Sequence, residues 1–181
     1  MRRELAAEDI RDLLAELGSR LAADGIEATI YIVGGAALSL EFDARRVTTD
    51  VDAVFHPRTT VRQVAEALAR EQDLPRDWLN DSVRAFVPGD DADAVRYSVP
   101  GLSIALASPR HLLAMKMAAF RPTDVTDLEV LFRALRIVSP EQAADIALGV
   151  YGEHSMVLPG RDELLLSARA VLDRLRRRAD G

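Results

Sequence analysis

The sequence predicts an α+β fold, in which a small mixed sheet is followed by a helical C-terminal part. Three observations lead to this prediction. Runs of β-branched and aromatic residues near 28–33 and 50–55 are typical of buried strands. A Pro-Gly pair joins two further runs, near 95–99 and 102–107, as in a hairpin. From residue 108 onward the apolar residues recur at helical spacing.

Helices account for most of the remaining chain. Apolar residues three and four apart predict helices over residues 4–24 and 59–71, and a short helix over residues 36–42. Residues 74–94 show no clear pattern, and Asp91 and Asp93 in their acidic turn are expected in a solvated loop.

The C-terminal part begins its helices with recognisable caps. Ser108-Pro109 combines a capping hydroxyl with a proline at the first helical position, and Ser139 begins a capping box. His111, near the first of these starts, is expected at the surface. The arginine-rich end from Arg169 to Arg178 either contacts an RNA backbone or is a solvated helix end.

Composition excludes several classes of protein. The chain has 181 residues, of which 49% are hydrophobic, which is too many for a disordered chain. No apolar run approaches the ~20 residues of a membrane span, and no signal peptide is evident, so a cytoplasmic protein is expected. The absence of cysteine excludes disulfide partners and thiolate metal sites. A net charge of −6 argues against an extensively basic surface but leaves a local basic groove open.

The segment from residue 30 to residue 55 carries the strongest chemical signal. A buried strand leads into Gly34 and Gly35, where the backbone can approach a phosphate at the start of a helix. The next strand carries Asp50 and Asp52, which are two residues apart and therefore share a face. Two carboxylates this close repel each other unless a cation lies between them, and an all-oxygen site suits Mg²⁺.

The positive charges point to a second position. The chain contains 22 arginines and a single lysine, Lys116, which indicates a site where a compact ammonium group matters. Its helical neighbours Leu112, Leu113 and Phe120 are apolar, so the lysine must reach outward or meet an anion.

These motifs together resemble a known superfamily. The pattern V-G-G-x-A-L, followed by R-x-T-x-D-V-D from Arg46 to Asp52, is similar to the nucleotidyltransferases related to polymerase β. Within that superfamily it looks like the AbiEii/MenT-type toxins of bacterial toxin–antitoxin systems. Their second motif is matched over residues 108–132, where Lys116, Arg121, Asp124 and Asp127 occupy its positions, and Asp127 is the aspartate expected to be functional.

The resemblance implies a nucleotidyltransferase that transfers a nucleoside monophosphate from a nucleoside triphosphate to an acceptor hydroxyl. The implied acceptor is the 3′ end of tRNA, the metal is Mg²⁺ with Mn²⁺ as the alternative, and a cognate antitoxin is expected. Asp50 and Asp52 would be the metal ligands, and with Lys116 and Asp127 they form the expected catalytic set. The expected nucleotide-binding residues are Gly34, Gly35, Arg46, Thr48, Thr49, Lys116 and Arg121.

The expected domains are an α+β nucleotidyltransferase core over residues 1–107 and a helical region over 108–181 that packs on the core and completes the active site. One departure from the family pattern concerns a third metal-associated carboxylate, which the strand near 102–107 does not contain. Asp91, Asp93 or Asp127 would have to replace it, so the general base remains open. Two alternatives also remain: a nucleotidyltransferase of small molecules such as antibiotics, and an inactive partner-binding member of the fold.

Overall fold

The computed structural model describes residues 3–42 and 46–179. The chain divides into two compact units. The first unit comprises Met1–Ala85 and Asp93–Ala107, and the second comprises Phe86–Ala92 and Ser108–Gly181. The elements, with η for a 3₁₀ helix, are α1 (Ala7–Ala23), β1 (Ala28–Ile32), α2 (Gly34–Glu41), β2 (Val51–His56), α3 (Arg58–Glu71), β3 (Leu79–Asn80), η1 (Ser82–Ala85), β4 (Val95–Val99), β5 (Leu102–Leu106), α4 (Pro109–Ala119), η2 (Pro122–Asp124), α5 (Val125–Ala134), α6 (Pro140–Tyr151) and α7 (Arg161–Ala179).

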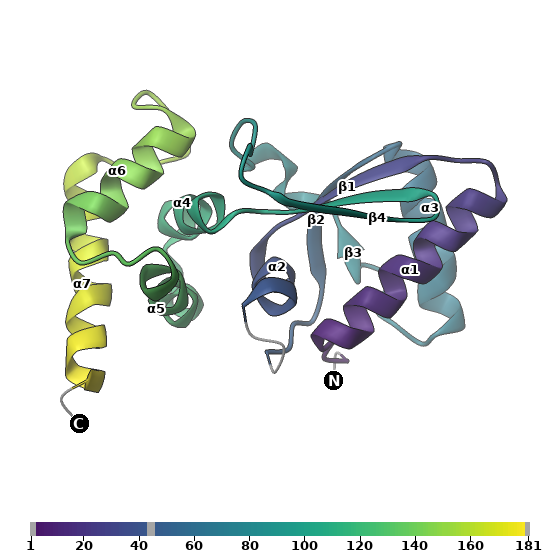
Figure 1. Cartoon of the computed structure of the whole chain (residues 1–181), viewed down its shortest axis with the longest axis horizontal. Coiled ribbons are helices and arrows are strands. Elements are labelled where there is room, and N and C mark those ends of the chain that lie inside the picture. Colours follow the sequence, from purple (N-terminus) through teal and green to yellow (C-terminus); the bar gives the residue numbers. More distant parts are fainter. Residues whose placement is uncertain (1–2, 43–45, 180–181) are drawn as a thin grey trace. The chain divides into compact units, whose positions relative to one another are not determined.

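The first unit is built on one mixed sheet of five strands in the order β3-β2-β1-β5-β4 (Figure 1). The central strand β1 runs antiparallel to β2 and parallel to β5, while β4 and β5 form the expected hairpin. The fifth strand, β3, pairs in parallel with β2 at the edge of the sheet. The predicted α+β fold with a mixed sheet is confirmed, and β3 is an addition to it.

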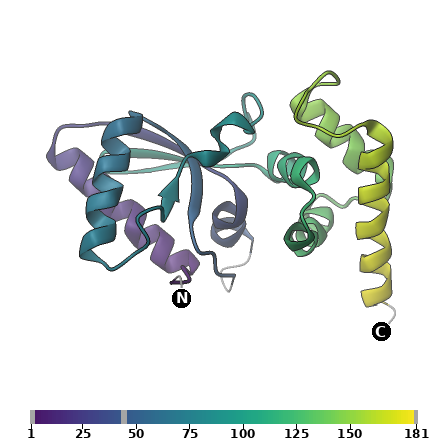
Figure 2. The ribbon, with the colours of Figure 1, turned by 180° about the vertical axis from the view of Figure 1, so that it is seen from behind.

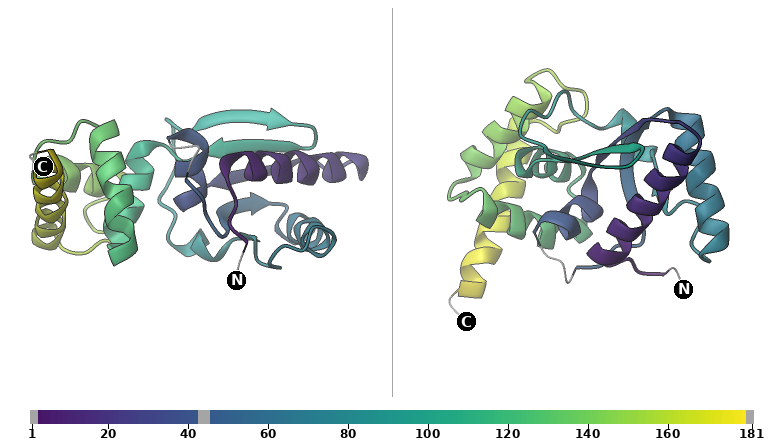
Figure 3. Two further views of the ribbon diagram at one scale, coloured as in Figure 1. Left: turned by 90° about the horizontal axis from the view of Figure 1, so that it is seen from below. Right: turned by 45° about the vertical axis from the view of Figure 1, so that its right-hand side comes forward.

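One face of this sheet forms the core of the first unit. Side chains along each central strand alternate, and the inward set is almost completely buried. That set comprises Ala28, Ile30, Ile32, Val51, Ala53, Phe55, Leu102, Ile104 and Leu106. Helices α1 and α3 pack side by side and cover this face (Figure 3). Asp52 lies on the opposite face of the sheet, which α1 and α3 do not cover.

The segment before β3 is fixed by a buried tryptophan. Trp78 is fully buried and its indole N–H donates a hydrogen bond to the Ala65 carbonyl of α3 at 3.0 Å. Its own carbonyl accepts from the N–H of Val51 at 2.6 Å, which starts the pairing of β2 with β3. The strand was not predicted because two residues are too few to show a period.

Helices α4 to α7 make up most of the second unit. Helix α6 packs against both α4 and α7, and α5 packs against α4 and α7 (Figure 2). The predicted caps are present: the Ser108 hydroxyl accepts from the His111 N–H at 3.3 Å, and Ser139 and Gln142 form a capping box. In the part of the chain that the structure describes, no helix is long and apolar enough to cross a membrane.

Two expectations about exposure were wrong. Asp91 and His111 are both buried, with 5% and 8% of their surface exposed. The Asp91 carboxylate accepts a hydrogen bond from the Ser108 N–H at 2.8 Å and lies 3.2 Å from Nδ1 of His111. The segment Phe86–Ala92 therefore folds onto the start of α4, a long-range contact that the local pattern does not reveal.

Candidate functional site

The start of α2 lies against the Asp52 carboxylate. Gly34, the first residue of α2, has φ +64°, and a Cβ built on it would lie 3.3 Å from Oδ2 of Asp52. A side chain at Gly34 would thus meet both a strained backbone and the carboxylate. The glycine is what allows Asp52, on the neighbouring strand β2, to lie so close to the backbone at the start of the helix.

The loop that leads into β2 is held beside the same helix start. A Cβ built on Gly35 would lie 3.3 Å from Oγ1 of Thr48. Thr48 exchanges two backbone hydrogen bonds with Leu5, of 2.7 and 3.0 Å, and its hydroxyl donates to the Asp50 carbonyl at 3.0 Å. The Ser39 hydroxyl donates to the Arg46 carbonyl at 2.7 Å.

The structure thus brings together most of the site residues predicted in the first unit. These are Gly34 with Asp52, Gly35 with Thr48 and, through their backbone carbonyls, Asp50 and Arg46. Thr49 is exposed and no contact ties its side chain to this group within the described residues.

The helix start is suited to bind an anion. Val33 is the N-cap of α2, and no side chain caps this end among the described residues. The first N–H groups of any α-helix have no partner within the helix, and here the missing side chains of Gly34 and Gly35 leave the backbone open. A phosphate oxygen is the kind of acceptor that such a helix end binds.

The Asp52 carboxylate fits a magnesium ion whose remaining ligands come mostly from water and a bound substrate. No group of three or more histidine, aspartate or glutamate side chains able to hold a metal is found among residues 3–42 and 46–179. Mg²⁺ is usually bound in proteins through one or two carboxylates, with water and substrate phosphates completing the shell. The Asp52 carboxylate is half-buried, and the structure shows no hydrogen bond or ion pair to it from another described residue. The Asp52 carboxylate therefore suits a metal that arrives with a nucleotide, and Asp50 is the second ligand expected from the sequence.

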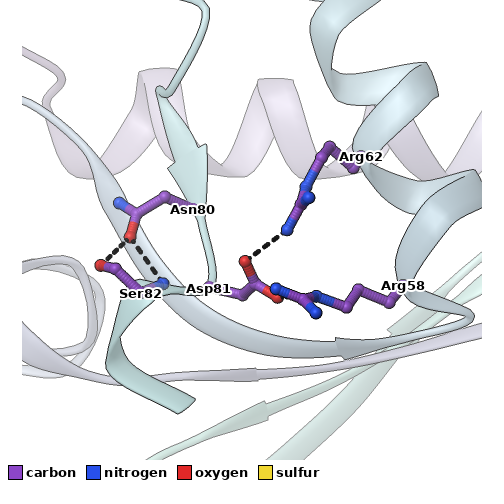
Figure 4. A network of polar contacts seen from close by, with 5 residues as sticks. All are labelled: Arg58, Arg62, Asn80, Asp81 and Ser82. Carbon is purple, nitrogen blue, oxygen red and sulfur yellow. Dashed lines mark hydrogen bonds and ion pairs between the residues drawn. The ribbon is translucent and has the colours of Figure 1, made fainter. Parts of the chain in front are cut away.

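A residue that the sequence analysis missed lies beside Asp52. In the parallel pair of β2 and β3, Asp52 and Asn80 are register partners, so both side chains are on the same face of the sheet. The next residue, Asp81, is 8% exposed and forms ion pairs with Arg58 and Arg62 of α3 (Figure 4). The hydrogen bond from Arg58, with the nearby charge of Arg62, lowers the pKa of Asp81. No sequence signal marked Asn80, because its place in the site depends on the short strand β3.

In the second unit, the predicted residues Lys116 and Asp127 belong to a charged cluster. Lys116 Nζ lies 2.5 Å from Asp124 Oδ1 and 2.8 Å from Asp127 Oδ2. Both carboxylates are buried, and Lys116 is 17% exposed. Asp124 also accepts a hydrogen bond from the Arg121 N–H at 3.1 Å, whereas Arg121 itself is exposed. The anions that the single lysine meets within its own unit are thus two carboxylates.

Comparison with known proteins identifies the family. A family described as "Nucleotidyltransferase of unknown function (DUF6036)" matches residues 8–134, which include the glycine pair, Asp50, Asp52 and the Lys116 cluster. The chain belongs to this family. Its members carry a nucleotidyltransferase name without an assigned substrate.

The other comparisons add little to this assignment. One similar solved structure is the crystal structure of an antigenic nucleotidyltransferase-like protein from Paracoccidioides brasiliensis. It is 16% identical, the match covers 98% of this chain and 92% of that chain, and the TM-score is 0.46. No curated protein matches the chain.

Proposed function

We propose that this member of the nucleotidyltransferase family is an active, metal-dependent enzyme that transfers a nucleoside monophosphate from a nucleoside triphosphate to an acceptor hydroxyl. The main support is the position of the Asp52 carboxylate against the glycine start of α2. This places a metal-binding group beside a phosphate-binding helix end, as a magnesium–nucleotide complex requires. The Asp-x-Asp motif adds a reason, because the fold alone needs neither carboxylate.

In the proposed reaction, the acceptor oxygen forms a bond to the α-phosphorus and the bond from that phosphorus to pyrophosphate breaks. Asp50 and Asp52 hold the metal, which when bound neutralises the charge that develops on the leaving pyrophosphate. The backbone N–H groups at Gly34 and Gly35 bind phosphate oxygens, and Thr48 keeps the loop before Asp50 in place. The proton of the acceptor hydroxyl passes to a base, for which Asp127 is the candidate from the sequence.

That Lys116, Arg121 and Asp127 act on the same substrate stays a prediction from the sequence. The ion pairs of Lys116 with Asp124 and Asp127 also support a structural role for this lysine, because its charge neutralises two buried carboxylates. Activity and stability must therefore be measured on the same Lys116 variants.

For the acceptor, we propose the 3′ end of tRNA, with the chain acting as a toxin that a cognate antitoxin protein restrains. The support is the resemblance of the two motifs, from Val33 to Asp52 and over residues 108–132, to the AbiEii/MenT-type toxins. Small molecules such as antibiotics are the competing class of acceptor.

The test is incubation of the purified protein with Mg²⁺, total tRNA and each α-³²P-labelled nucleoside triphosphate in turn. We expect label on tRNA from at least one triphosphate, and none on tRNA whose 3′ hydroxyls have been destroyed by periodate oxidation. Label on a small-molecule acceptor in place of tRNA would reject the toxin assignment and keep the reaction class. No label on any acceptor would favour an inactive partner-binding protein.

A further inference from the structure

Asn80 occupies a position beside the proposed metal ligand that neither motif includes. The register of β2 and β3 pairs Val51 with Leu79 and Asp52 with Asn80. Val51 and Leu79 are buried, whereas Asp52 and Asn80 are both half-buried on the opposite face. Neighbouring strands lie roughly 5 Å apart, so the amide of Asn80 is within reach of a ligand bound at Asp52.

The orientation of the Asn80 amide is fixed by its neighbour. Its Oδ1 accepts hydrogen bonds from the backbone N–H of Ser82 at 3.2 Å and from the Ser82 hydroxyl at 2.5 Å (Figure 4). A backbone N–H can only donate, so the atom that faces Ser82 must be the carbonyl oxygen. The amide NH₂ is then the end left for another partner, and no acceptor for it is found within the described residues.

The segment that carries Asn80 is anchored to helix α3. Asp81 is buried and is held by Arg58 and Arg62 from the first two turns of α3. Asn80 is therefore held by the pairing of β3 with β2 and, through the next residue, by the ion pairs of the buried Asp81 carboxylate with two half-exposed arginines. Such a support keeps a side chain in one position, which is what a binding residue needs.

We propose that Asn80 is a binding residue of the nucleotide site, whose Nδ2 donates a hydrogen bond to an anionic phosphate oxygen of the nucleoside triphosphate held at Asp52. The inference rests on the proposed function and extends it. A neutral donor at this position also limits the site to the two carboxylates Asp50 and Asp52. The site consequently binds metal weakly by itself and binds it together with the nucleotide.

The variant Asn80→Asp separates this role from a purely structural one. An aspartate still accepts both hydrogen bonds from Ser82, so the turn after β3 is preserved, while the NH₂ donor becomes an anionic oxygen. Ser82→Ala is the matched control, because it leaves the backbone N–H bonded to Oδ1 and the NH₂ unchanged. Binding of Mn²⁺ alone, and of an α,β-methylene nucleoside triphosphate without metal, is measured by calorimetry on each full-length protein.

For Asn80→Asp we expect about tenfold tighter binding of Mn²⁺, since a third carboxylate joins the site, and about tenfold weaker binding of the metal-free nucleotide. Ser82→Ala should change neither affinity by more than about twofold. Wild-type affinities for both ligands in folded Asn80→Asp would overturn the inference and leave the proposed function intact. A wild-type protein that binds neither Mn²⁺ nor any nucleotide would overturn the proposed function as well. If Asn80→Asp does not fold, Asn80→Ser replaces it. The shorter serine side chain cannot reach the phosphate and adds no carboxylate, so nucleotide affinity should fall while Mn²⁺ binding stays unchanged.

Discussion

Lys116 and Asp127 form a 2.8 Å ion pair in which the carboxylate is 2% exposed. Lys116 contacts Asp124 as well, so one ammonium group serves two buried carboxylates from the turn and helix that follow α4. The only lysine of the chain is thereby part of the second unit's own structure, independent of any ligand.

Replacement of Lys116 by methionine should destabilise the protein. Two buried carboxylates would lose their cation, and breaking a buried pair in this way costs about 3 kcal/mol. The free energy of unfolding, measured by urea titration, tests this value. Arg110→Met is the control, because Arg110 is an exposed cation on the same helix with no ion pair among the described residues. An equal and small effect of both changes would contradict the structural role of Lys116.

Lys116→Arg addresses the functional role. Arginine keeps the charge but replaces a compact ammonium group with a larger planar group. If Lys116 also binds the nucleotide, we expect this variant to lose at least tenfold in transfer rate while it loses less stability than Lys116→Met. A fully active Lys116→Arg enzyme would limit this residue to structure.

Gly34→Ala should disrupt the phosphate-binding end of α2. The positive φ of +64° costs an alanine about 1 kcal/mol, and the new methyl group lies 3.3 Å from the Asp52 carboxylate. Nucleotide affinity should fall together with stability. Gly149→Ala, at an exposed position inside α6 with open space around it, is the control and should raise stability by about 0.5–1 kcal/mol. Unchanged nucleotide binding in Gly34→Ala would argue against the helix start as the phosphate site.

Asp81 should make the stability depend on acid pH. Its pKa is lowered in the folded protein, chiefly by the hydrogen bond from Arg58. A lowered pKa means that the carboxylate stabilises the fold above its ordinary pKa near 4, and that this contribution is lost as the pH falls through the lower folded value. Unfolding free energies between pH 2 and 6 should therefore fall less steeply for Asp81→Asn than for the wild type. Identical slopes would exclude this origin.

The arginine-rich end of α7 is partly explained by an ion-pair network. Glu129 is 1% exposed and accepts hydrogen bonds from Arg174 at 2.6 Å and Arg178 at 2.5 Å. Because both arginines are about half exposed, we expect Arg174→Ala and Arg178→Ala each to cost only about 1 kcal/mol of stability. Arg177→Ala, which removes an exposed arginine between them, should cost less than about 0.5 kcal/mol. Equal losses of stability at the three positions, measured by thermal unfolding, would show that the ion pairs with Glu129 do not stabilise the protein.

Most of the local structure could be predicted from the sequence, whereas the partners of several charged residues could not. Strands with clear alternation, such as Val51–His56, and helices with a cap, such as the one after Ser108, were predictable because their signals are local. The glycine pair and Asp52 lie within a short span of chain, so the sequence alone could place them in one candidate site, and the structure puts the Asp52 carboxylate against Gly34.

What the sequence did not reveal depends on contacts between distant segments. Strand β3 is two residues long, so Asn80 had no visible period, and its partnership with Asp52 appears only in the register of the sheet. The burial of Asp91 and His111 arises because Phe86–Ala92 returns to α4. Asp124 and Asp127 could be picked out by their match to the second motif. Their ion pairs with Lys116 could not be predicted, because these depend on the turn between α4 and α5.

The most direct test of nucleotidyl transfer uses two labels on the same nucleoside triphosphate. With Mg²⁺ and an acceptor, the α-³²P label should enter the acceptor and the γ-³²P label should appear only in pyrophosphate. Asp52→Asn should abolish both signals while its unfolding transition stays within about 1 kcal/mol of the wild type. Transfer of the γ label to the acceptor, or full activity in folded Asp52→Asn, would contradict the account.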